Sequence, residues 1–237
     1  MSSQNIFQRT ELKYLLTKEQ KRTILQGMDP YMKEDAYGKT TIRNLYFDTD
    51  TYLLIRRSIE KPEYKEKLRM RSYSRAQLNN EVFVELKKKY KGTVHKRRIK
   101  LTQQEAMDWL CNGKPCTKDT QIAREIDYVM NYYSGLSPKV FLSYDREAYY
   151  GREDDRLRVT FDDNILFREE DLNLDSHIYG TRLLPEELVL MEIKCIGGMP
   201  LWMAKLLSQE KIYKTSFSKY GTAYREHIHP KQTGGTQ

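Results

Sequence analysis

Alternation of apolar and charged side chains with a period of two residues is the feature that most restricts the fold of this chain. Residues 64–73 (YKEKLRMRSY) and 82–89 (VFVELKKK) show it over most of their length. Successive side chains of a strand point to opposite faces of a sheet, so this period predicts strands with one apolar and one charged face. Six further segments also predict strands: 7–15, 41–48, 93–101, 139–149, 156–162 and 188–195.

Four segments between the predicted strands have helical spacing instead. Thr17 and Thr102 are each followed three residues later by glutamine or glutamate, the spacing of a capping box, which predicts that helices begin there. Apolar residues three and four apart predict two more helices, over 118–133 and 200–209. This order of elements predicts an α+β fold: an antiparallel eight-stranded β-barrel with helices packed outside it and at its ends.

Composition excludes several classes of protein. No apolar run approaches the ~20 residues of a membrane helix, and the first residues have no apolar stretch of signal-peptide type. Three cysteines without a CxxC pair argue against a disulfide framework or a zinc site. We therefore expect a cytoplasmic protein with no membrane segment. Because no glycine- or proline-rich linker divides the chain, we expect one domain over 1–229 and a flexible tail over 230–237.

The polar positions of the predicted strands favour lysine and arginine. They are Lys67, Arg69, Arg71, Glu85, Lys87, Lys96, Arg98, Tyr144, Arg146, Arg158, Thr160, Asp162, Glu192 and Lys194. The apolar partners expected on the opposite faces are Leu68, Met70, Val84, Leu86, Val94, Leu142, Val159, Phe161 and Ile193.

Two arrangements of these faces are open. The charged face can be a solvated outer surface, or the sheet can close so that helices cover its apolar face and the charges line a water-filled lumen. Amphipathic helices need an apolar sheet surface to cover, and the charged face is mainly basic, which favours the lumen. Two like charges ~4 Å apart repel by about 4 kcal/mol at an effective dielectric constant near ~20, so a lumen lined with cations has to be wet or filled by a polyanion.

Eight segments in order resemble the VTC-type polyphosphate polymerase domain, a member of the CYTH or triphosphate tunnel metalloenzyme superfamily. They are RTELKYLL, KLRMRSY, FVELKKK, VHKRR, SYDREAY, LRVTFDD, MEIK and SFSKY, and they span nearly the whole chain. The resemblance implies a tunnel-shaped barrel that binds a nucleoside triphosphate or a polyphosphate chain and holds a divalent metal.

The resemblance also implies roles for individual residues. Lys13, Arg69, Arg71, Lys87 and Lys219 are expected to act in catalysis, and Lys67, Lys96, Arg98, Tyr144, Arg146, Arg158, Lys194 and Ser218 to bind phosphate. Glu192 in MEIK is the expected metal ligand, with Glu11 or Glu85 beside it, and the metal is Mn²⁺ or Mg²⁺. Where the superfamily has an ExExK motif, this chain has Arg9 in place of the first glutamate, which favours a polymerase and weighs against a two-metal site.

The leading hypothesis is a metal-dependent phosphotransferase that moves the γ-phosphate of ATP onto a growing polyphosphate chain. Two alternatives stay open: a metal-dependent triphosphatase that acts on nucleoside triphosphate, inorganic triphosphate or pyrophosphate, and a non-catalytic module that binds polyphosphate. The formal charge of +8 alone would favour nucleic acid. However, the basic residues are distributed singly along strands, so we expect no specific nucleic acid partner. Coupling to a membrane would need a separate membrane protein.

Overall fold

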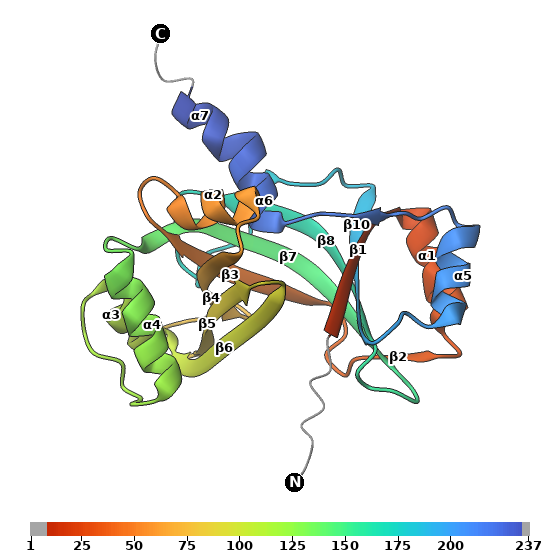
Figure 1. The fold of residues 1–237 in the computed structure, drawn as a ribbon, viewed down its shortest axis with the longest axis horizontal. Coiled ribbons are helices and arrows are strands. Elements are labelled where there is room, and N and C mark those ends of the chain that lie inside the picture. The colour runs from red at the N-terminus through yellow and green to blue at the C-terminus, as the bar shows by residue number, and fades with distance from the viewer. Residues whose placement is uncertain (1–8, 234–237) are drawn as a thin grey trace. The chain divides into compact units, whose positions relative to one another are not determined.

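The computed structural model of the protein describes residues 9–233 and contains an 11-stranded antiparallel sheet (Figure 1). The strand order is β11-β1-β10-β8-β7-β3-β4-β5-β6, with β2 paired to β7 and β9 paired to β8. The strands are β1 (Arg9–Thr17), β2 (Met32–Glu34), β3 (Thr40–Asp48), β4 (Tyr64–Ser72), β5 (Glu81–Tyr90), β6 (Thr93–Thr102), β7 (Ser137–Gly151), β8 (Arg158–Arg168), β9 (Thr181–Arg182), β10 (Leu188–Ile196) and β11 (Lys214–Thr215).

Seven α-helices and one π-helical turn accompany the sheet in the described part of the chain. They are α1 (Lys18–Met28), α2 (Leu53–Glu60), α3 (Gln103–Cys111), α4 (Gln121–Tyr132), α5 (Leu201–Gln209), α6 (Lys219–Ala223), the turn η1 (Tyr224–Ile228) and α7 (His229–Thr233). No helix in residues 9–233 combines the length and the apolar composition needed to cross a membrane.

The predicted α+β class is confirmed, but the closed eight-stranded barrel is not what the structure shows. All eight expected strands are present, and three short ones, β2, β9 and β11, join them. Strands of two or three residues are too short to leave a period in the sequence. The path of pairing is also open, because β11 and β6 are its two ends among the described residues.

The chain divides into two compact units, each built from separate segments. The described residues of unit 1 are 9–40, 144–165 and 184–217, and those of unit 2 are 41–143, 166–183 and 218–233. The single domain expected over 1–229 stays a prediction. Part of the expected tail is helical, since α7 runs to Thr233, and residues 234–237 lie outside the described part. Residues 7 and 8 of the first predicted strand lie outside it as well.

In unit 1, α1 and α5 lie side by side and cover one face of the strands (Figure 1). Ile24 and Met28 of α1 and Met203 and Leu207 of α5 are buried against alternate residues of β1, β8 and β10. These strand residues are Tyr14, Leu16, Val159, Phe161, Val189, Met191 and Ile193. The capping box at the start of α1 is confirmed: Thr17 Oγ1 accepts from the backbone N–H of the glutamine three residues later, and that glutamine's side chain accepts from the N–H of Thr17.

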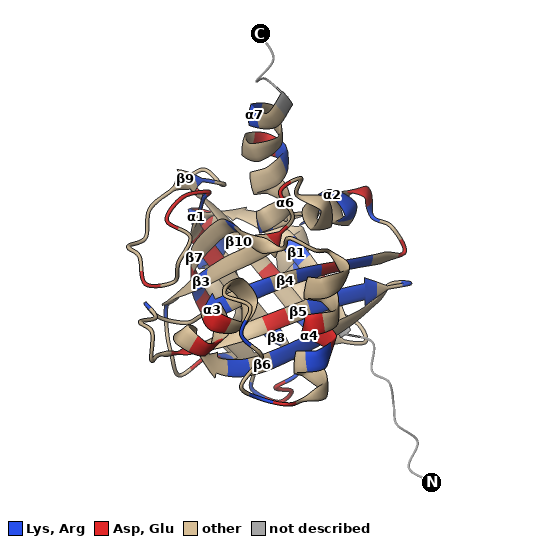
Figure 2. Ribbon diagram, turned by 90° about the vertical axis from the view of Figure 1, so that its left-hand side faces the viewer, with Lys and Arg blue, Asp and Glu red and all other residues tan. Residues whose placement is uncertain are grey.

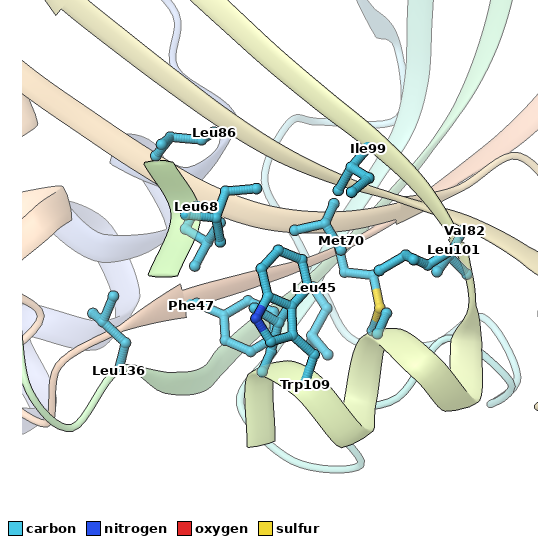
Figure 3. Close-up of a cluster of buried hydrophobic side chains, with 14 of the residues drawn as sticks. Leu45, Phe47, Leu68, Met70, Val82, Leu86, Ile99, Leu101, Trp109 and Leu136 are labelled. Atoms are coloured by element: carbon cyan, nitrogen blue, oxygen red, sulfur yellow. The ribbon is translucent and has the colours of Figure 1, made fainter. Parts of the chain in front are cut away.

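In unit 2, α3 and α4 cover the apolar face of β4, β5 and β6. Figure 3 shows Trp109 of α3 within the cluster that contains Leu45, Phe47 and Met70. The other strand residues of this core are Leu68, Val82, Val84, Leu86, Ile99 and Leu101. The capping box at Thr102 is also confirmed. Two of the expected apolar positions depart from this pattern. Val94 alternates in step with Lys96 and pairs with Lys89, so it lies on the lysine side of the hairpin and is exposed; Leu142 alternates in step with Arg146, although it is buried.

In each unit, helices therefore cover the apolar face of the strands, and the charged side chains lie on the other face; in unit 2, Tyr220 of α6 packs there against Tyr46. Figure 2 shows lysine and arginine along β4, β5 and β6. This arrangement of apolar faces under helices is the one that the lumen hypothesis requires. It gives each unit one polar face on which the residues singled out from the sequence are found.

Candidate functional site

The polar face of unit 1 is built from cross-strand rows on β1, β10 and β8. The antiparallel register places Lys13 opposite Glu192, and Glu192 opposite Thr160; the next row contains Glu11, Lys194 and Arg158. Directly opposite side chains in a sheet are close enough to interact. Two separate sequence motifs, RTELKYLL and MEIK, are therefore brought into contact by strand pairing alone.

Four of these charges form a closed group of ion pairs. Lys13 Nζ lies 3.3 Å from Glu192 Oε1 and 3.6 Å from Glu11 Oε1. Lys194 Nζ lies 3.6 Å from Glu192 Oε2 and 3.8 Å from Glu11 Oε2. Lys13 Nζ also donates a 2.9 Å hydrogen bond to the Phe217 carbonyl, which fixes its side chain. Each glutamate thus has two lysines beside it, and Glu192 is the more buried of the two glutamates.

Arg146 of β7 is a fixed cation next to this group. Its Nε and Nη2 donate to the two carboxylate oxygens of buried Asp162 at 2.6 and 2.7 Å, and its Nη2 lies 3.8 Å from Glu192 Oε2. Its guanidinium lies 5.0 Å from the centre of the Tyr144 ring. Burial acts to lower the pKa of Arg146, but the charge of Asp162 outweighs it and raises the pKa well above its ordinary value. Asp162 was in the predicted charged face but was not predicted as a site residue.

Three buried polar atoms on β8 have no hydrogen-bond partner among the described residues: Arg158 Nε, Thr160 Oγ1 and Asp163 Oδ1. The Arg158 guanidinium instead lies 4.9 Å from the centre of the Tyr150 ring. An unpaired buried hydroxyl costs free energy, so the position of Thr160, in the row of Lys13 and Glu192, suits contact with a bound ligand. Sequence analysis placed Thr160 on the charged face without giving it a role.

The acidic residues of unit 1 fit a metal that is bound together with a phosphate. In residues 9–233, no group of three or more histidine, cysteine, aspartate or glutamate side chains is arranged to hold a metal ion alone. Mg²⁺ in proteins is usually bound by one or two carboxylates, with substrate phosphates and water supplying the other oxygens. Glu192 and Glu11, which share two lysines, are such a pair of carboxylates.

The polar face of unit 2 is centred on Glu85, whose side chain is 1% exposed. Arg69 Nε donates to Glu85 Oε2 at 2.7 Å, while Lys96 Nζ and Arg98 Nε reach Oε1 at 2.7 and 2.6 Å. Burial acts to raise the pKa of Glu85, but the charges of Arg69, Arg71 and Lys96 outweigh it and hold the pKa far below its ordinary value. Glu85 is therefore an ionised counterion whose two oxygens already bind cations.

The other predicted cations of unit 2 lie in rows next to Glu85. Lys67, Lys87 and Lys96 form the adjoining cross-strand row. On the other side, buried Arg71 donates from Nε to Asn44 Oδ1 at 2.8 Å, and Asn44 Nδ2 donates to the Leu142 carbonyl at 3.0 Å. Asn44 was missed from the sequence because nothing local marks it; its role follows from the pairing of β3 with β4.

The SFSKY segment is anchored through Tyr220 rather than through Ser218. Ser218 caps α6 by accepting from the Gly221 N–H, and Lys219 is the first residue of that helix. The buried Tyr220 hydroxyl donates to Asp48 Oδ2 at 3.0 Å, and Asp48 also accepts from the Leu54 and Ile55 N–H groups at the start of α2.

Tyr46 continues this anchor toward Arg69. Its ring centre lies 4.7 Å from that of Tyr220, and its hydroxyl lies 3.1 Å from Arg69 Nη1. Burial raises the pKa of Tyr220 well above its ordinary value, and the nearby Asp48 carboxylate adds to the effect, so the hydroxyl keeps its proton. Lys219 is thus held by a segment that also supports Arg69.

The structure brings most of the predicted residues into two groups. Glu11, Lys13, Tyr144, Arg146, Arg158, Glu192 and Lys194 belong to unit 1, and Lys67, Arg69, Arg71, Glu85, Lys87, Lys96, Arg98, Ser218 and Lys219 belong to unit 2. The group of unit 2 is a basic surface around one carboxylate, whereas in the group of unit 1 carboxylates and cations alternate. Such surfaces can bind phosphate oxygens through arginine forks and lysine point charges, and they contain no arrangement of a nucleophile with a base.

Comparison with known proteins agrees with this geometry. The profile of the VTC domain family matches residues 8–227. Subunit 4 of the vacuolar transporter chaperone complex of Schizosaccharomyces pombe is 26% identical over 184 residues, which are 68% of this chain and 25% of that protein. The chain therefore spans about a quarter of the length of that relative.

A solved structure shows that the fold is shared more widely. The crystal structure of a candidate adenylate cyclase from Bacillus halodurans superposes with a TM-score of 0.55 at 19% identity, covering 88% of this chain and 92% of the other. This likeness shows a common fold. With a family profile that matches almost its whole length, the chain belongs to the VTC domain family.

Proposed function

We propose that this protein is a polyphosphate polymerase that transfers the γ-phosphate of ATP to the end of an inorganic polyphosphate chain. Membership of the VTC domain family supports a role with polyphosphate. The single observation that carries the proposal is the group of Arg69, Lys96 and Arg98 around one buried carboxylate, Glu85. Three cations around one anion leave positive charge for phosphate oxygens to neutralise.

In unit 2, the cations bind and orient the phosphates. Arg69 and Arg98 present guanidinium groups that Glu85 and neighbouring tyrosines hold in place, since Tyr46 and Tyr73 each contact one of them at 3.1 and 2.9 Å. Fixed donors of this kind stabilise charge that develops on transferring phosphate oxygens, because they need no reorganisation during the reaction. Lys67, Lys87 and Lys96 add point charges in the next row.

In unit 1, Glu192 and Glu11 would hold Mn²⁺ or Mg²⁺, and a bound ion of this kind neutralises charge on phosphate oxygens. Glu85 is less suited to this role, because its cations lie within hydrogen-bond distance of its oxygens, at 2.6 to 2.7 Å, whereas those beside Glu192 lie at 3.3 to 3.8 Å. Lys13, fixed by its bond to the Phe217 carbonyl, would stabilise phosphate charge in unit 1, and Lys219 would do so in unit 2.

The reaction needs no protein nucleophile. A terminal phosphate oxygen of the chain attacks the γ-phosphorus of ATP, the bond from that phosphorus to the β–γ bridging oxygen breaks, and ADP leaves with the electron pair. Catalysis then consists of positioning and electrostatic stabilisation, which is typical of phosphoryl transfer. The proposal requires that loss of a key charge in either unit reduces polymer formation.

The test is to incubate the purified protein with ATP and Mn²⁺ or Mg²⁺, with and without a short polyphosphate primer, and to resolve the products on a gel. We expect polyphosphate and ADP to appear together. Release of orthophosphate from tripolyphosphate without chain growth would identify a triphosphatase instead. Binding of polyphosphate with neither reaction would identify a non-catalytic module and overturn the proposal.

A further inference from the structure

The positive charge of this protein is concentrated at one end of the β4–β5–β6 sheet. The start of β4 and the adjoining end of the β5–β6 hairpin, residues 61–67 and 87–97, are here called the hairpin rim. The rim contains nine lysines and arginines and two glutamates, a net charge of +7 in a chain whose formal charge is +8. Pairing of Tyr64 with Tyr90, and of Tyr90 with Thr93, places these segments at the same end of the sheet (Figure 2).

The two faces of the rim differ in how their charges are neutralised. On the face covered by α4, Lys88 Nζ and Arg97 Nε lie 3.3 and 3.2 Å from the Glu125 carboxylate, so this helix supplies a counterion. Glu66 on the same face accepts a hydrogen bond from the Tyr64 hydroxyl at 2.8 Å. The charges of this face are therefore matched within the fold.

The opposite face of the rim is a ladder of lysines. Lys65 lies opposite Lys89, and the next row contains Lys67, Lys87 and Lys96. Among the described residues, no ion pair joins Lys61, Lys65, Lys87 or Lys89 to a carboxylate. The pKa of Lys65 is lowered by burial and by the charges of Lys89, Lys61 and Lys87. Like charges directly opposite each other destabilise a sheet, so this face gains stability when an anion lies across it.

The lysine ladder continues the polar face that surrounds Glu85. Lys67 and Lys65 follow Arg69 at intervals of two residues along β4, and Lys87 and Lys89 follow Glu85 along β5 in the same way. Two residues of a strand span about 7 Å, so the ladder extends the basic face by about 13 Å from the row of Arg69 and Glu85. A polyanion bound at Glu85's cations can therefore extend along the strands onto the rim.

We propose that the lysine face of the hairpin rim is a docking surface for the distal phosphates of a long polyphosphate chain. This inference rests on the proposed function and extends it. It states that residues outside the two candidate groups make the protein bind a long polyphosphate chain more tightly than a triphosphate. Five rim lysines belong to neither group; Lys65 donates to the Ser58 carbonyl and Lys88 pairs with Glu125, which leaves Lys61, Lys89 and Lys91. They would capture the chain by charge alone, as mobile point charges that tolerate any register of phosphates.

The alternative partner, single-stranded nucleic acid, fits the rim less well. Such proteins place aromatic platforms for the bases on the same groove as the cations for the backbone. Here the exposed Tyr64 and Tyr90 are each two residues from Glu66 and Lys88, so they lie on the same face of the sheet as those residues, the face that α4 covers. Helix α4 itself carries the exposed pair Tyr128 and Tyr132. The tyrosines and the lysine ladder are thus on opposite faces of the sheet, which suits a ligand with phosphates and no bases.

The test compares a rim variant, K61Q/K89Q/K91Q, with a matched control, K18Q/K33Q/K205Q. The control removes the same charge from exposed positions outside the rim. Binding of long-chain polyphosphate and of tripolyphosphate is measured without nucleotide or metal, over a range of salt concentrations. We expect the rim variant to lose about tenfold or more in affinity for the long chain, with a slope of log K against log salt reduced by about 2, at about 0.7 per lost contact. Its affinity for tripolyphosphate should stay within about twofold, and the control should bind both ligands like the wild type.

Several outcomes would overturn this assignment. An unchanged affinity for long-chain polyphosphate, or an equal loss for both ligands, would show that the rim does not bind distal phosphates. If oligo(U) RNA bound more tightly than long-chain polyphosphate, and if replacing Tyr128 and Tyr132 by alanine abolished that binding, the rim would be a nucleic acid site. Because binding is measured without turnover, failure of the polymerase assay leaves this test intact. Equal melting temperatures of the three proteins establish that the fold is retained.

Discussion

The two units present polar faces of opposite electrostatic design. In unit 1 carboxylates and cations alternate: Glu192 and Glu11 share Lys13 and Lys194, and Asp162 binds Arg146. In unit 2 one central carboxylate, Glu85, meets three cations, and the adjoining rows consist of lysines. Unit 1 is nearly neutral and rich in oxygen ligands, whereas unit 2 has an excess of positive charge.

This difference separates two tasks that phosphoryl transfer combines. A site that binds a hard divalent cation needs carboxylate oxygens held close together, which unit 1 supplies. A site that binds several phosphates needs more cations than there are carboxylates to neutralise them, and unit 2 supplies that excess. We therefore expect variants in unit 1 to act on turnover or on the fold, and variants in unit 2 to act on anion affinity.

The largest effect is expected from Glu192→Gln. The change keeps the shape of the side chain and removes the charge that would hold the metal, so polymer formation should fall by about 10²–10³-fold. The fold should survive, because the amide can still accept a hydrogen bond from Lys13. The measurement is the initial rate of ADP formation at saturating ATP, beside the melting temperature. Glu186→Gln, at an exposed glutamate of the same unit, is the control and should behave like the wild type. Full activity in Glu192→Gln would contradict the proposal that unit 1 holds the metal.

Within unit 1, Arg146 and Arg158 should separate structure from binding. Arg146→Ala removes the ion pair of the buried carboxylate of Asp162, so the free energy of unfolding should fall by about 3 kcal/mol. Arg158 has no ion pair among the described residues and contacts the Tyr150 ring, so Arg158→Ala should cost under about 1 kcal/mol of stability while weakening tripolyphosphate binding. Urea unfolding and a binding titration on both variants give the comparison. Equal losses of stability would contradict it.

In unit 2, Glu85→Gln tests whether the central carboxylate is a counterion. Its partners are partly exposed, so after screening the loss of stability at about pH 7 should be about 2 kcal/mol. The pKa of Glu85 is depressed in the folded protein, so its contribution is complete above its ordinary pKa of 4.5 and declines as pH falls below that value. The difference in the free energy of unfolding between wild type and variant should therefore narrow only at acidic pH. Urea unfolding at several pH values measures it. Glu81→Gln, at an exposed carboxylate of the same strand, is the control.

A second readout of Glu85→Gln distinguishes a counterion from a metal ligand. Tripolyphosphate should raise the melting temperature of the variant by more than that of the wild type, because phosphate oxygens replace the missing carboxylate between Arg69, Lys96 and Arg98. If tripolyphosphate raised the melting temperature of the variant by less than that of the wild type, and did so only in the presence of Mn²⁺, Glu85 would instead be a metal ligand.

The sequence predicted those parts of the fold that leave a local signal. Alternation located the long strands and their charged faces, and the capping boxes at Thr17 and Thr102 located the starts of α1 and α3. It did not predict α2, because that helix begins at Tyr52 in a left-handed conformation without a side-chain cap of its own. The carboxylate of Asp48 supplies the missing acceptor from the end of β3, a contact that no helical spacing reveals.

The candidate site was predicted residue by residue but not in its pairing. Parity along each strand placed Lys13, Glu192 and Arg69 on polar faces, and the resemblance to the VTC domain assigned them roles. Which charges neutralise each other depends on register between distant strands, so the partners of Arg146 and Arg71, Asp162 and Asn44, could not be assigned. The same dependence explains why closure of the sheet could not be deduced from the number of strands.

The smallest effect, and the sharpest test of unit 1, is expected from Thr160→Val. Valine has nearly the same shape and removes only the hydroxyl, which is buried and has no partner among residues 9–233. If that hydroxyl serves only the fold, its removal should leave stability unchanged or raise it by up to about 1 kcal/mol, because an unpaired polar atom leaves the interior. If it contacts a ligand beside Lys13 and Glu192, the same variant should also lose about tenfold in kcat/KM for ATP, since one hydrogen bond contributes about 1 kcal/mol. Thr160→Ser, which keeps the hydroxyl, should restore the activity at some cost in packing. If Thr160→Val were stable and had the wild-type kcat/KM, the charged residues of unit 1 would bind their ligand without the Thr160 hydroxyl.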